Sequence, residues 1–250
     1  MAGLRKEGMI EMRSYFYLLA AVSLLLSPGL ADTMKSPISE ETQKTQHFVK
    51  YNYSNTAAVP VTVKVNASGD NLKTSQNMPY LFVIPPRGSK EAFQTSAKDP
   101  RAYYSAPDVR VEFKFGDYRL GGSNMPLSLP WAKGKSATVE SVERNALNLK
   151  MDAGEKVVAG RAGLVVATER DSVTVAHNDG SVTIYSGLKS VTAKLGSQVQ
   201  AGQELGAAGE EPVGFQVAVP DQGMNYRALP ANFTVKGSKT TLSAGESYKN

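Results

Sequence analysis

From residue 47 onward the chain is a succession of short runs in which apolar and polar side chains alternate. Residues 59–65 read Val-Pro-Val-Thr-Val-Lys-Val, and residues 109–115 read Val-Arg-Val-Glu-Phe-Lys-Phe. Alternation with a period of two is typical of a β-strand that buries one face. Glycine, proline and asparagine separate the runs, and no segment of ten residues has a convincing helical period. The pattern predicts an all-β fold.

The runs divide the chain into two β domains. In residues 47–122 their spacing favours a small antiparallel sandwich of immunoglobulin-like type. The side chains expected to face its core are Val59, Val61, Val63, Val65, Phe82, Ile84, Val109, Val111, Phe113 and Phe115. Residues 123–135 contain two prolines and are expected to be a linker. Short strands resume in residues 136–235, and residues 236–250 are expected to form a polar tail or an edge strand.

The first 31 residues have the features of a targeting segment. Residues 15–26 are an apolar run of twelve, preceded by Arg13 and followed by Gly29-Leu-Ala31. A bilayer-spanning helix needs about 20 apolar residues, so the run is too short. A basic flank, a short apolar run and a small-x-small site predict a cleaved signal peptide, with an uncleaved anchor as the alternative. The polar residues 32–46 are expected to be a flexible leader.

Composition excludes several classes of function. The chain has no cysteine, which excludes disulfides and a lipid anchor on cysteine. Removing residues 1–31 removes three of 28 basic and two of 23 acidic residues, so the net charge falls from +5 to +4. No basic run with interleaved aromatic residues is present, so we expect no nucleic-acid partner. We also expect no stable membrane insertion after signal cleavage.

The second domain contains four spaced motifs of glycine and valine. They are Gly154-Glu-Lys-Val157-Val-Ala159, Val173-Thr-Val-Ala-His177-Asn-Asp-Gly180, Leu195-Gly196-Ser-Gln-Val199-Gln-Ala-Gly202-Gln203-Glu-Leu205-Gly206, and Phe215-Gln-Val217. In order and spacing these segments resemble the lysostaphin-type (LytM-like) zinc endopeptidases. The resemblance implies that residues 136–235 have the duplicated hybrid motif fold of that family, which is a β domain.

The same resemblance implies where a catalytic zinc site would lie. The family holds its zinc with His, Asp and His, and further histidines act on water and on the oxyanion. The corresponding positions here are Arg144, Asn148, Gly187, Pro212 and Gly214. An amide is a poor zinc ligand because it carries no charge, and a guanidinium repels the cation. We therefore expect a degenerate member with no metal, no cofactor and no catalytic residue.

Other chemistries find few residues to support them. Beyond residue 31 the only histidines are His47, expected to be incidental, and His177, expected to be structural or exposed. Asp152, Asp171 and Asp179 lie in turn contexts that favour aspartate for backbone reasons. The Gly-Gln-x-Leu segment also occurs in biotinyl and lipoyl carrier domains, but the next lysine is the distant Lys236. No Gly-x-Ser-x-Gly motif is present.

The resemblance also places a groove over the lost zinc site. Its expected lining residues are Arg144, Asn148, Tyr185, Ser186 and Gln216. Arg144 is suited to bind a carboxylate, and the alternative is that these residues merely fill a dead site. The expected function is that of a non-catalytic, exported cell-envelope protein, periplasmic or extracellular. It would bind peptidoglycan or activate a partner peptidoglycan hydrolase such as an amidase. The alternatives are an active zinc metalloendopeptidase and a structural envelope module.

Overall fold

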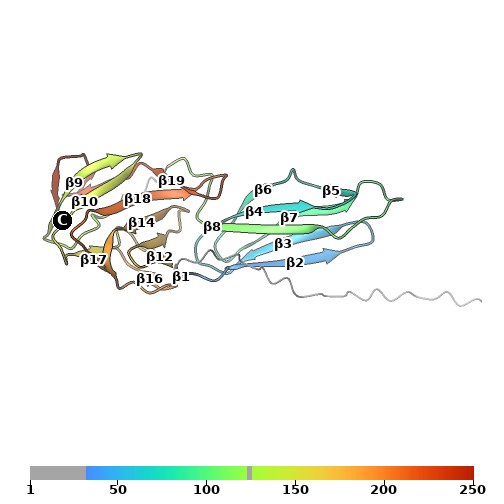
Figure 1. Cartoon of the computed structure of the whole chain (residues 1–250), viewed down its shortest axis with the longest axis horizontal. Helices are drawn as coiled ribbons and strands as arrows, with labels where there is room; N and C mark the ends of the chain where they lie inside the picture. The colour runs from blue at the N-terminus through green and yellow to red at the C-terminus, as the bar shows by residue number, and fades with distance from the viewer. Residues whose placement is uncertain (1–31, 123–125) are drawn as a thin grey trace, which may run out of the picture.

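The computed structural model describes residues 32–122 and 126–250, and the expected signal peptide lies outside these ranges. The described chain is built from β-strands, so the all-β prediction is confirmed. Within those residues there is no helix with the length and apolar character needed to cross a membrane. Two domains lie end to end along the long axis of the molecule (Figure 1).

The N-terminal domain is a sandwich of two antiparallel sheets. The four-stranded sheet has the order β2 (Ile38–Lys44), β3 (Val49–Asn55), β7 (Ser89–Ala97) and β5 (Leu72–Thr74). The three-stranded sheet has the order β6 (Tyr80–Ile84), β4 (Val61–Ser68) and β8 (Asp108–Phe115). The alternating valines of β4 are fully buried between the sheets, as their pattern predicts. Val109, Val111 and Phe113 of β8 pack against the same core but are only partly buried.

The strand order of this sandwich differs from the immunoglobulin-like order. In that fold the fifth strand lies in the four-stranded sheet and the sixth in the three-stranded sheet. Counted from β2, the first strand of the sandwich, the fifth strand is β6 and the sixth is β7. Here β6 lies in the three-stranded sheet and β7 lies in the four-stranded sheet. From β3 onward each successive strand crosses to the other sheet. The two-sheet sandwich agrees with the prediction, but the immunoglobulin-like connectivity does not.

The prediction of a flexible leader at residues 32–46 is wrong, because β2 pairs with β3 along its whole length. Two of its inward-facing residues, Glu40 and Thr42, are polar. The sequence of this strand therefore lacks the apolar alternation by which a strand is predicted. Glu40 is accommodated because its carboxylate accepts a hydrogen bond from the Tyr53 hydroxyl at 2.6 Å. A buried phenol that needs an acceptor therefore explains an acidic residue on the inner side of this strand.

The C-terminal domain is organised around one large sheet. The order of its strands is β1 (Asp32–Thr33), β12 (Gly163–Thr168), β13 (Val173–Ala176), β14 (Val182–Ser186), β18 (Val213–Pro220), β10 (Ala146–Lys150), β9 (Ser136–Glu143) and β22 (Ser247–Lys249). In addition, β16 (Gln198–Val199) pairs with β12, and β19 (Tyr226–Leu229) pairs with β18. A small sheet of β11 (Lys156–Val158), β17 (Glu204–Ala208) and β15 (Leu188–Val191) and a hairpin of β20 (Phe233–Val235) and β21 (Ser238–Thr240) complete the domain.

The segment expected to be a linker belongs to the core of this domain. Leu127, Leu129 and Trp131 are almost fully buried in the C-terminal core. Leu127 forms a β-bridge with Phe233, and Trp131 forms one with Val157. The last residues are an edge strand rather than a free tail, because β22 pairs with β9. The main part of the C-terminal domain therefore includes residues 127–249, and β1 adds a separate strand to its sheet.

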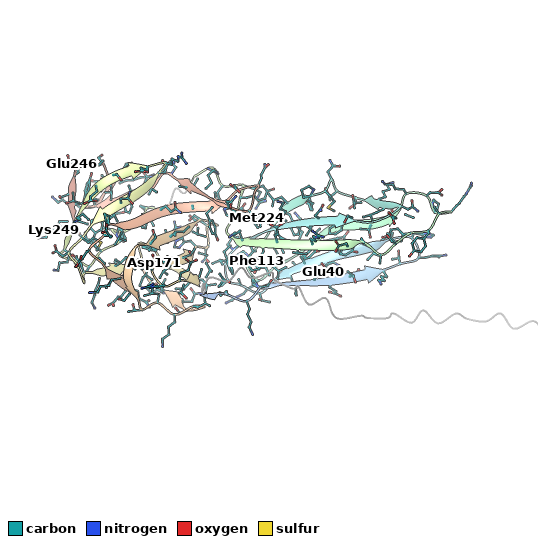
Figure 2. The ribbon with its side chains drawn as sticks, in the orientation of Figure 1. Glu40, Phe113, Asp171, Met224, Glu246 and Lys249 are labelled. Carbon is teal, nitrogen blue, oxygen red and sulfur yellow. The ribbon has the colours of Figure 1, made fainter. Side chains whose placement is uncertain are left out.

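The sandwich packs on part of the large sheet. We call the sheet face that points away from the C-terminal core the outer face. Five of its residues join the same buried cluster as the sandwich core: Leu164, Val166, Ala176, Val182 and Ala218. The Asp117 amide donates to the Gly180 carbonyl at 2.7 Å, and the Tyr226 hydroxyl donates to the Phe115 carbonyl at 3.2 Å. The turn that contains Met224 lies at this junction (Figure 2). The sandwich thus covers one half of the outer face.

Candidate functional site

Four positions form a row across the uncovered half of the outer face. Ser141 of β9 pairs with Asn148 of β10, and Asn148 pairs with Gly214 of β18. On the other side of β18, Gly214 pairs with Ser186 of β14. Successive residues of a strand face opposite sides, and the neighbouring Leu147, Leu149, Tyr185 and Phe215 are buried in the core. The four positions, which we call the polar row, therefore face outward together.

The polar row is neutral and internally hydrogen-bonded. The Asn148 amide nitrogen donates to the Ser141 hydroxyl oxygen at 2.8 Å. The Ser186 hydroxyl lies over Gly214, at the place that a side chain on residue 214 would enter. A larger side chain at 214 would require Ser186 to turn away. The row offers amide and hydroxyl groups and no carboxylate or imidazole.

Arg144 lies beyond the end of this row. With Asn145 it forms the two-residue turn between β9 and β10, and the two residues have φ angles of 48° and 70°. Positive φ at both central residues is the geometry of a type I′ hairpin turn. Asn148 lies four positions after Arg144, at most about 13 Å away along an extended chain. Arg144 is therefore an exposed cation at the rim of the outer face.

The last two residues expected to line the groove, Gln216 and Tyr185, lie on opposite faces of the sheet. Gln216 is half-buried on the outer face, two residues from Gly214 and opposite Ile184 of β14. Tyr185 points the other way, and its side chain is fully buried in the core. There its hydroxyl accepts a hydrogen bond from the Gly160 amide at 2.8 Å, and its ring meets Phe215 edge-on. Burial raises the pKa of this phenol. The expectation that Tyr185 lines the groove is corrected.

Gly187 and Pro212 lie at the end of β14, beside the polar row. Gly187 has a φ of 72°, a left-handed conformation that side chains with a Cβ disfavour. A Cβ at this position would also lie 2.9 Å from the Pro212 carbonyl oxygen. Gly187 contributes to a cavity of about 390 Å³ together with Asp171, Glu210 and Glu211. These carboxylates come from loops and lie outside the polar row.

His177 is a buried structural residue at the β13–β14 hairpin. One ring nitrogen is 2.8 Å from the Ala162 carbonyl oxygen, and the other is 3.0 Å from the Thr183 hydroxyl. Burial, followed by the nearby Arg161 cation, lowers the pKa of His177 to about 4. Arg161, which precedes β12, pairs with Asp179 of this hairpin at 3.0 Å. The neutral imidazole thus serves to hold the turn in place.

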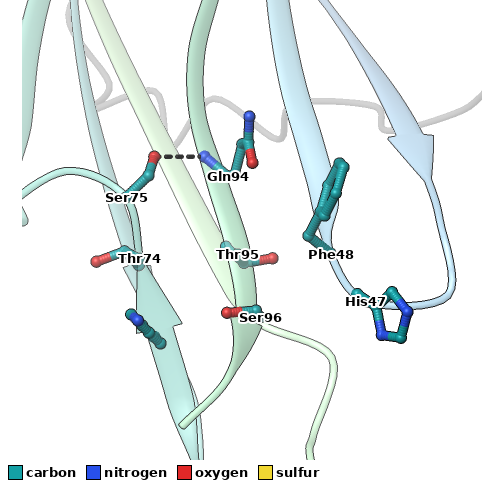
Figure 3. Close-up of a pocket in the computed structure, with 8 residues that line it drawn as sticks. His47, Phe48, Thr74, Ser75, Gln94, Thr95 and Ser96 are labelled. Carbon is teal, nitrogen blue, oxygen red and sulfur yellow. Dashed lines mark hydrogen bonds between the residues drawn. The ribbon is translucent and has the colours of Figure 1, made fainter.

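His47 lies in the other domain, at a shallow cavity of about 300 Å³ on the four-stranded sheet. Figure 3 shows it beside Phe48, with hydroxyl-bearing side chains of β5 and β7 across the cavity. The Ser75 hydroxyl there accepts a hydrogen bond from the backbone N–H of Gln94 at 2.8 Å. Lys73 is the other titratable group that lines this cavity. The arrangement brings no second imidazole or carboxylate to His47.

Comparison with known families identifies the C-terminal domain. Residues 143–219 match the model of Peptidase family M23. The domain is M23-like. The matched range includes the whole polar row except Ser141, and it includes all four motifs that carry the lysostaphin-type resemblance. The predicted resemblance is therefore confirmed for this domain.

Solved structures overlap the chain only loosely. Pseudoalterin, described as an M23 metalloprotease from the deep sea, is 17% identical over 51% of this chain and 100% of its own, with a TM-score of 0.36. A putative M23 peptidase from Pseudomonas aeruginosa is 16% identical over 64% and 89%, with a TM-score of 0.32. Helicobacter pylori Csd3 is 11% identical over 86% and 77%, with a TM-score of 0.34. Overlaps of this quality do not bear on function. No curated protein matches the chain.

The donor set of the M23-like domain does not fit a catalytic zinc ion. Zinc sites in proteins use cysteine, histidine and carboxylate side chains, at least three of them in catalytic sites. Among the residues that the structure describes, no three such side chains come together to hold a metal. The polar row supplies one amide and two hydroxyls instead. At Gly187 the backbone conformation itself disfavours a larger residue.

Sequence reasoning missed Ser141, which completes the polar row as the hydrogen-bond partner of Asn148. The signal that could have found it is the short spacing between residues 141 and 148 around the Arg144-Asn145 turn. A two-residue hairpin turn at 144–145 places residue 141 directly across from residue 148. Arginine followed by asparagine is a weaker turn signal than Asn-Gly.

Proposed function

We propose that this protein is a non-catalytic, exported cell-envelope protein whose M23-like domain acts by binding. Its ligand would be peptidoglycan, or a peptidoglycan hydrolase that it activates. The observation that supports the proposal is the polar row, in which neutral hydrogen-bonding groups lie at and beside two of the positions expected to correspond to metal ligands, Asn148 and Gly214. A face of this kind lacks the means to polarise a peptide bond but retains groups that hold a polar ligand in place.

The residues present suit an uncharged, amide-rich ligand with occasional carboxylates. Asn148, Ser186 and Gln216 offer donors and acceptors from three neighbouring strands. Stem peptides and acetylated sugars present amide and hydroxyl groups of matching kind. Arg144 at the rim carries the positive charge that would pair with a carboxylate on a stem peptide or on a partner loop.

The first test asks whether the protein is an enzyme. The full chain would be purified without chelators, its zinc content measured by mass spectrometry, and its activity tested on purified peptidoglycan with soluble products separated chromatographically. We expect no stoichiometric zinc and no cleavage. Stoichiometric zinc together with turnover would establish the active metalloendopeptidase instead.

The second test asks whether the outer face binds. We expect the double variant Asn148→Ala with Gln216→Ala, and likewise Arg144→Ala with Gln216→Ala, to weaken co-sedimentation with peptidoglycan by about tenfold. Two lost hydrogen bonds of ordinary strength account for a change of this size. The matched control is Gln43→Ala with Asn66→Ala, two exposed polar residues of the N-terminal sandwich. Unchanged binding in the outer-face variants would rule out this face as the binding surface.

A third measurement separates the two ligands. The immobilised full chain would be exposed to an envelope extract, and retained proteins would be assayed for peptidoglycan hydrolysis with and without added chain. Stimulated hydrolase activity indicates the activator, and binding to bare peptidoglycan alone indicates the wall-binding protein. If neither occurs, the chain is a structural envelope module.

A further inference from the structure

Strand β8 has one free edge. Among the described residues it pairs with β4 only, over its full length from Asp108 to Phe115 and without a bulge. A long, regular edge strand leaves a row of unpaired backbone donors and acceptors, which makes it a natural template for another strand. Beside this edge lies a cleft of about 970 Å³ between β8 and β2, lined by Val109, Val111 and Tyr51 among others. There is therefore room alongside the strand.

The facing edge strand, β2, is protected in a way that β8 is not. Proteins discourage edge pairing by placing charged residues on the inner side of an edge strand. In β2 the charged residue on the inner side is Glu40. Figure 2 shows Glu40 on the sandwich together with Phe113 of β8. In β8 the inner positions are Val109, Val111 and Phe113, which are only partly buried, while its charged residues face outward. The inner side of β8 thus remains open to apolar cover.

The sequence of β8, Asp-Val-Arg-Val-Glu-Phe-Lys-Phe, is complementary to itself when paired antiparallel. With a two-fold axis at Val111, Arg110 lies opposite Glu112 of a second copy, and Asp108 lies opposite its Lys114. On the inner side, Val109 lies opposite Phe113, and Val111 lies opposite its own copy. Both faces are matched at once, with two kinds of ion pair outside and apolar contacts inside.

Other symmetric registers match less of the strand or bring like charges together. An axis at Arg110 would place Asp108 opposite Glu112, and an axis at Glu112 would place Arg110 opposite Lys114. Both bring like charges together, which destabilises a strand pair. An axis between two residues would place apolar side chains on the charged face. An axis at Val109 or Phe113 also brings opposite charges together, but it pairs fewer residues of β8 and forms only one kind of ion pair. The axis at Val111 therefore gives the longest overlap in which both faces are matched.

We propose that two copies of this chain pair through the free edges of β8, antiparallel and centred on Val111, to form one six-stranded sheet. The charged side chains are available for this exchange, since Arg110 and Asp108 are 80% and 62% exposed and make only a local ion pair with each other. Lys114 lies over the ring of Tyr226 at the domain junction. The inner side chains of the second copy would cover the open side of the cleft. This pairing does not depend on what the M23-like domain binds.

The first test is a charge exchange followed by analytical ultracentrifugation of the full chain. We expect a concentration-dependent dimer, and Arg110→Glu or Glu112→Arg should weaken it at least about tenfold, because each places like charges opposite each other twice. The double variant Arg110→Glu with Glu112→Arg should restore the dimer, since it rebuilds both ion pairs in reverse. Lys73→Glu on the remote strand β5 is the control and should have no effect. A monomer at roughly 100 μM, or a dimer that ignores the single reversals, would overturn the proposal.

The second test uses the lack of cysteine in the chain. In Val111→Cys the two thiols would face each other across the axis, where strand partners are about 5 Å apart between Cα atoms, within disulfide range. In Val109→Cys the thiols would be offset by four residues, or about 13 Å. We expect oxidation to cross-link the first variant and not the second. Equal cross-linking of both, or of neither, would contradict the register.

Discussion

At the scale of single residues, the local structure disfavours a side chain at two of the positions that the family resemblance assigns to zinc ligands, Gly187 and Gly214. Gly187 has a φ of 72°, and a Cβ there would lie 2.9 Å from the Pro212 carbonyl oxygen. At Gly214 the space for a side chain is filled by the Ser186 hydroxyl. Replacing one residue by histidine would therefore not rebuild a ligand. The surrounding strand end has adapted to glycine.

This adaptation predicts the cost of adding a methyl group at residue 187. We expect Gly187→Ala to lower the free energy of unfolding by about 1–2 kcal/mol, because alanine disfavours the left-handed conformation. The control is Gly209→Ala in the same region, where a Cβ would find its nearest neighbour at 3.7 Å. Urea denaturation followed by tryptophan fluorescence measures both. Equal losses of unfolding free energy in the two variants would show that the left-handed conformation at residue 187 does not determine the cost of the substitution.

His177 makes the stability of the protein depend on pH. Its pKa is about 4 in the folded chain, below the usual 6.5, because burial disfavours the charged ring. The unfolded chain therefore binds more protons between these values, and stability is complete above pH 6.5 and falls as the pH drops toward 4. Between pH 7.5 and 5.5 the loss from this residue is about 1 kcal/mol.

The measurement is chemical denaturation of the wild type and of His177→Gln at both pH values. We expect the variant to be less stable at pH 7.5 but to show a smaller loss on acidification, because it lacks the titrating group. An NMR titration of the His177 ring gives the pKa directly. A normal pKa in the folded protein, or an identical pH dependence of the variant, would contradict the buried neutral ring.

The prediction of site residues from sequence failed where strand parity was ignored. Asn148, Ser186 and Gln216 do share the outer face. Tyr185 does not, because consecutive strand residues point to opposite sides and Ser186 already faces outward. That correction was available from the sequence. The position of Arg144 was not, because it depends on the turn that ends β9.

At the scale of elements, boundaries were harder to predict than the elements themselves. The apolar alternation of β4 and β8 identified both strands within the N-terminal domain. The two prolines in residues 123–135 predict a linker, yet Leu127, Leu129 and Trp131 are buried in the C-terminal core. Prolines mark where regular pairing stops but not where packing stops. A segment without regular secondary structure can therefore belong to a core although its sequence shows no periodic apolar pattern.

The buried segment predicts which fragment folds. A fragment that begins at residue 126 retains the three large apolar side chains, whereas one that begins at residue 136 loses them. Deleting a single large core side chain costs about 2–5 kcal/mol, so losing three exceeds the stability of most domains. We expect a cooperative thermal transition by circular dichroism only for the longer fragment. A folded 136–250 fragment would show that the segment is dispensable.

At the scale of the whole molecule, the two domains are packed into one body. A single buried cluster contains the sandwich valines and the outer-face residues Val182 and Ala218. One backbone hydrogen bond, from the Asp117 amide to the Gly180 carbonyl, reinforces the contact. The end-to-end arrangement in Figure 1 is therefore maintained by packing and not by a tether alone.

Shared packing predicts shared unfolding. The single tryptophan, Trp131, reports on the C-terminal domain, and hydrogen exchange of β4 peptides reports on the sandwich. We expect both signals to change at the same denaturant concentration. Val182→Glu should separate them, because it places a charge in the shared apolar contact. Separate midpoints in the wild type would show that the domains are independent.

The short strand β1 gives the chain an order of assembly. Asp32 pairs with Thr168, so the first described residues complete a sheet whose other strands are synthesised much later. Because every strand of the sandwich precedes β12 in the sequence, the sandwich can form before β1 has its pairing partner. The sandwich is thus an insertion between two parts of one domain, and closing that domain is the final step. A chain stalled before residue 168 would present a finished sandwich with its junction face uncovered.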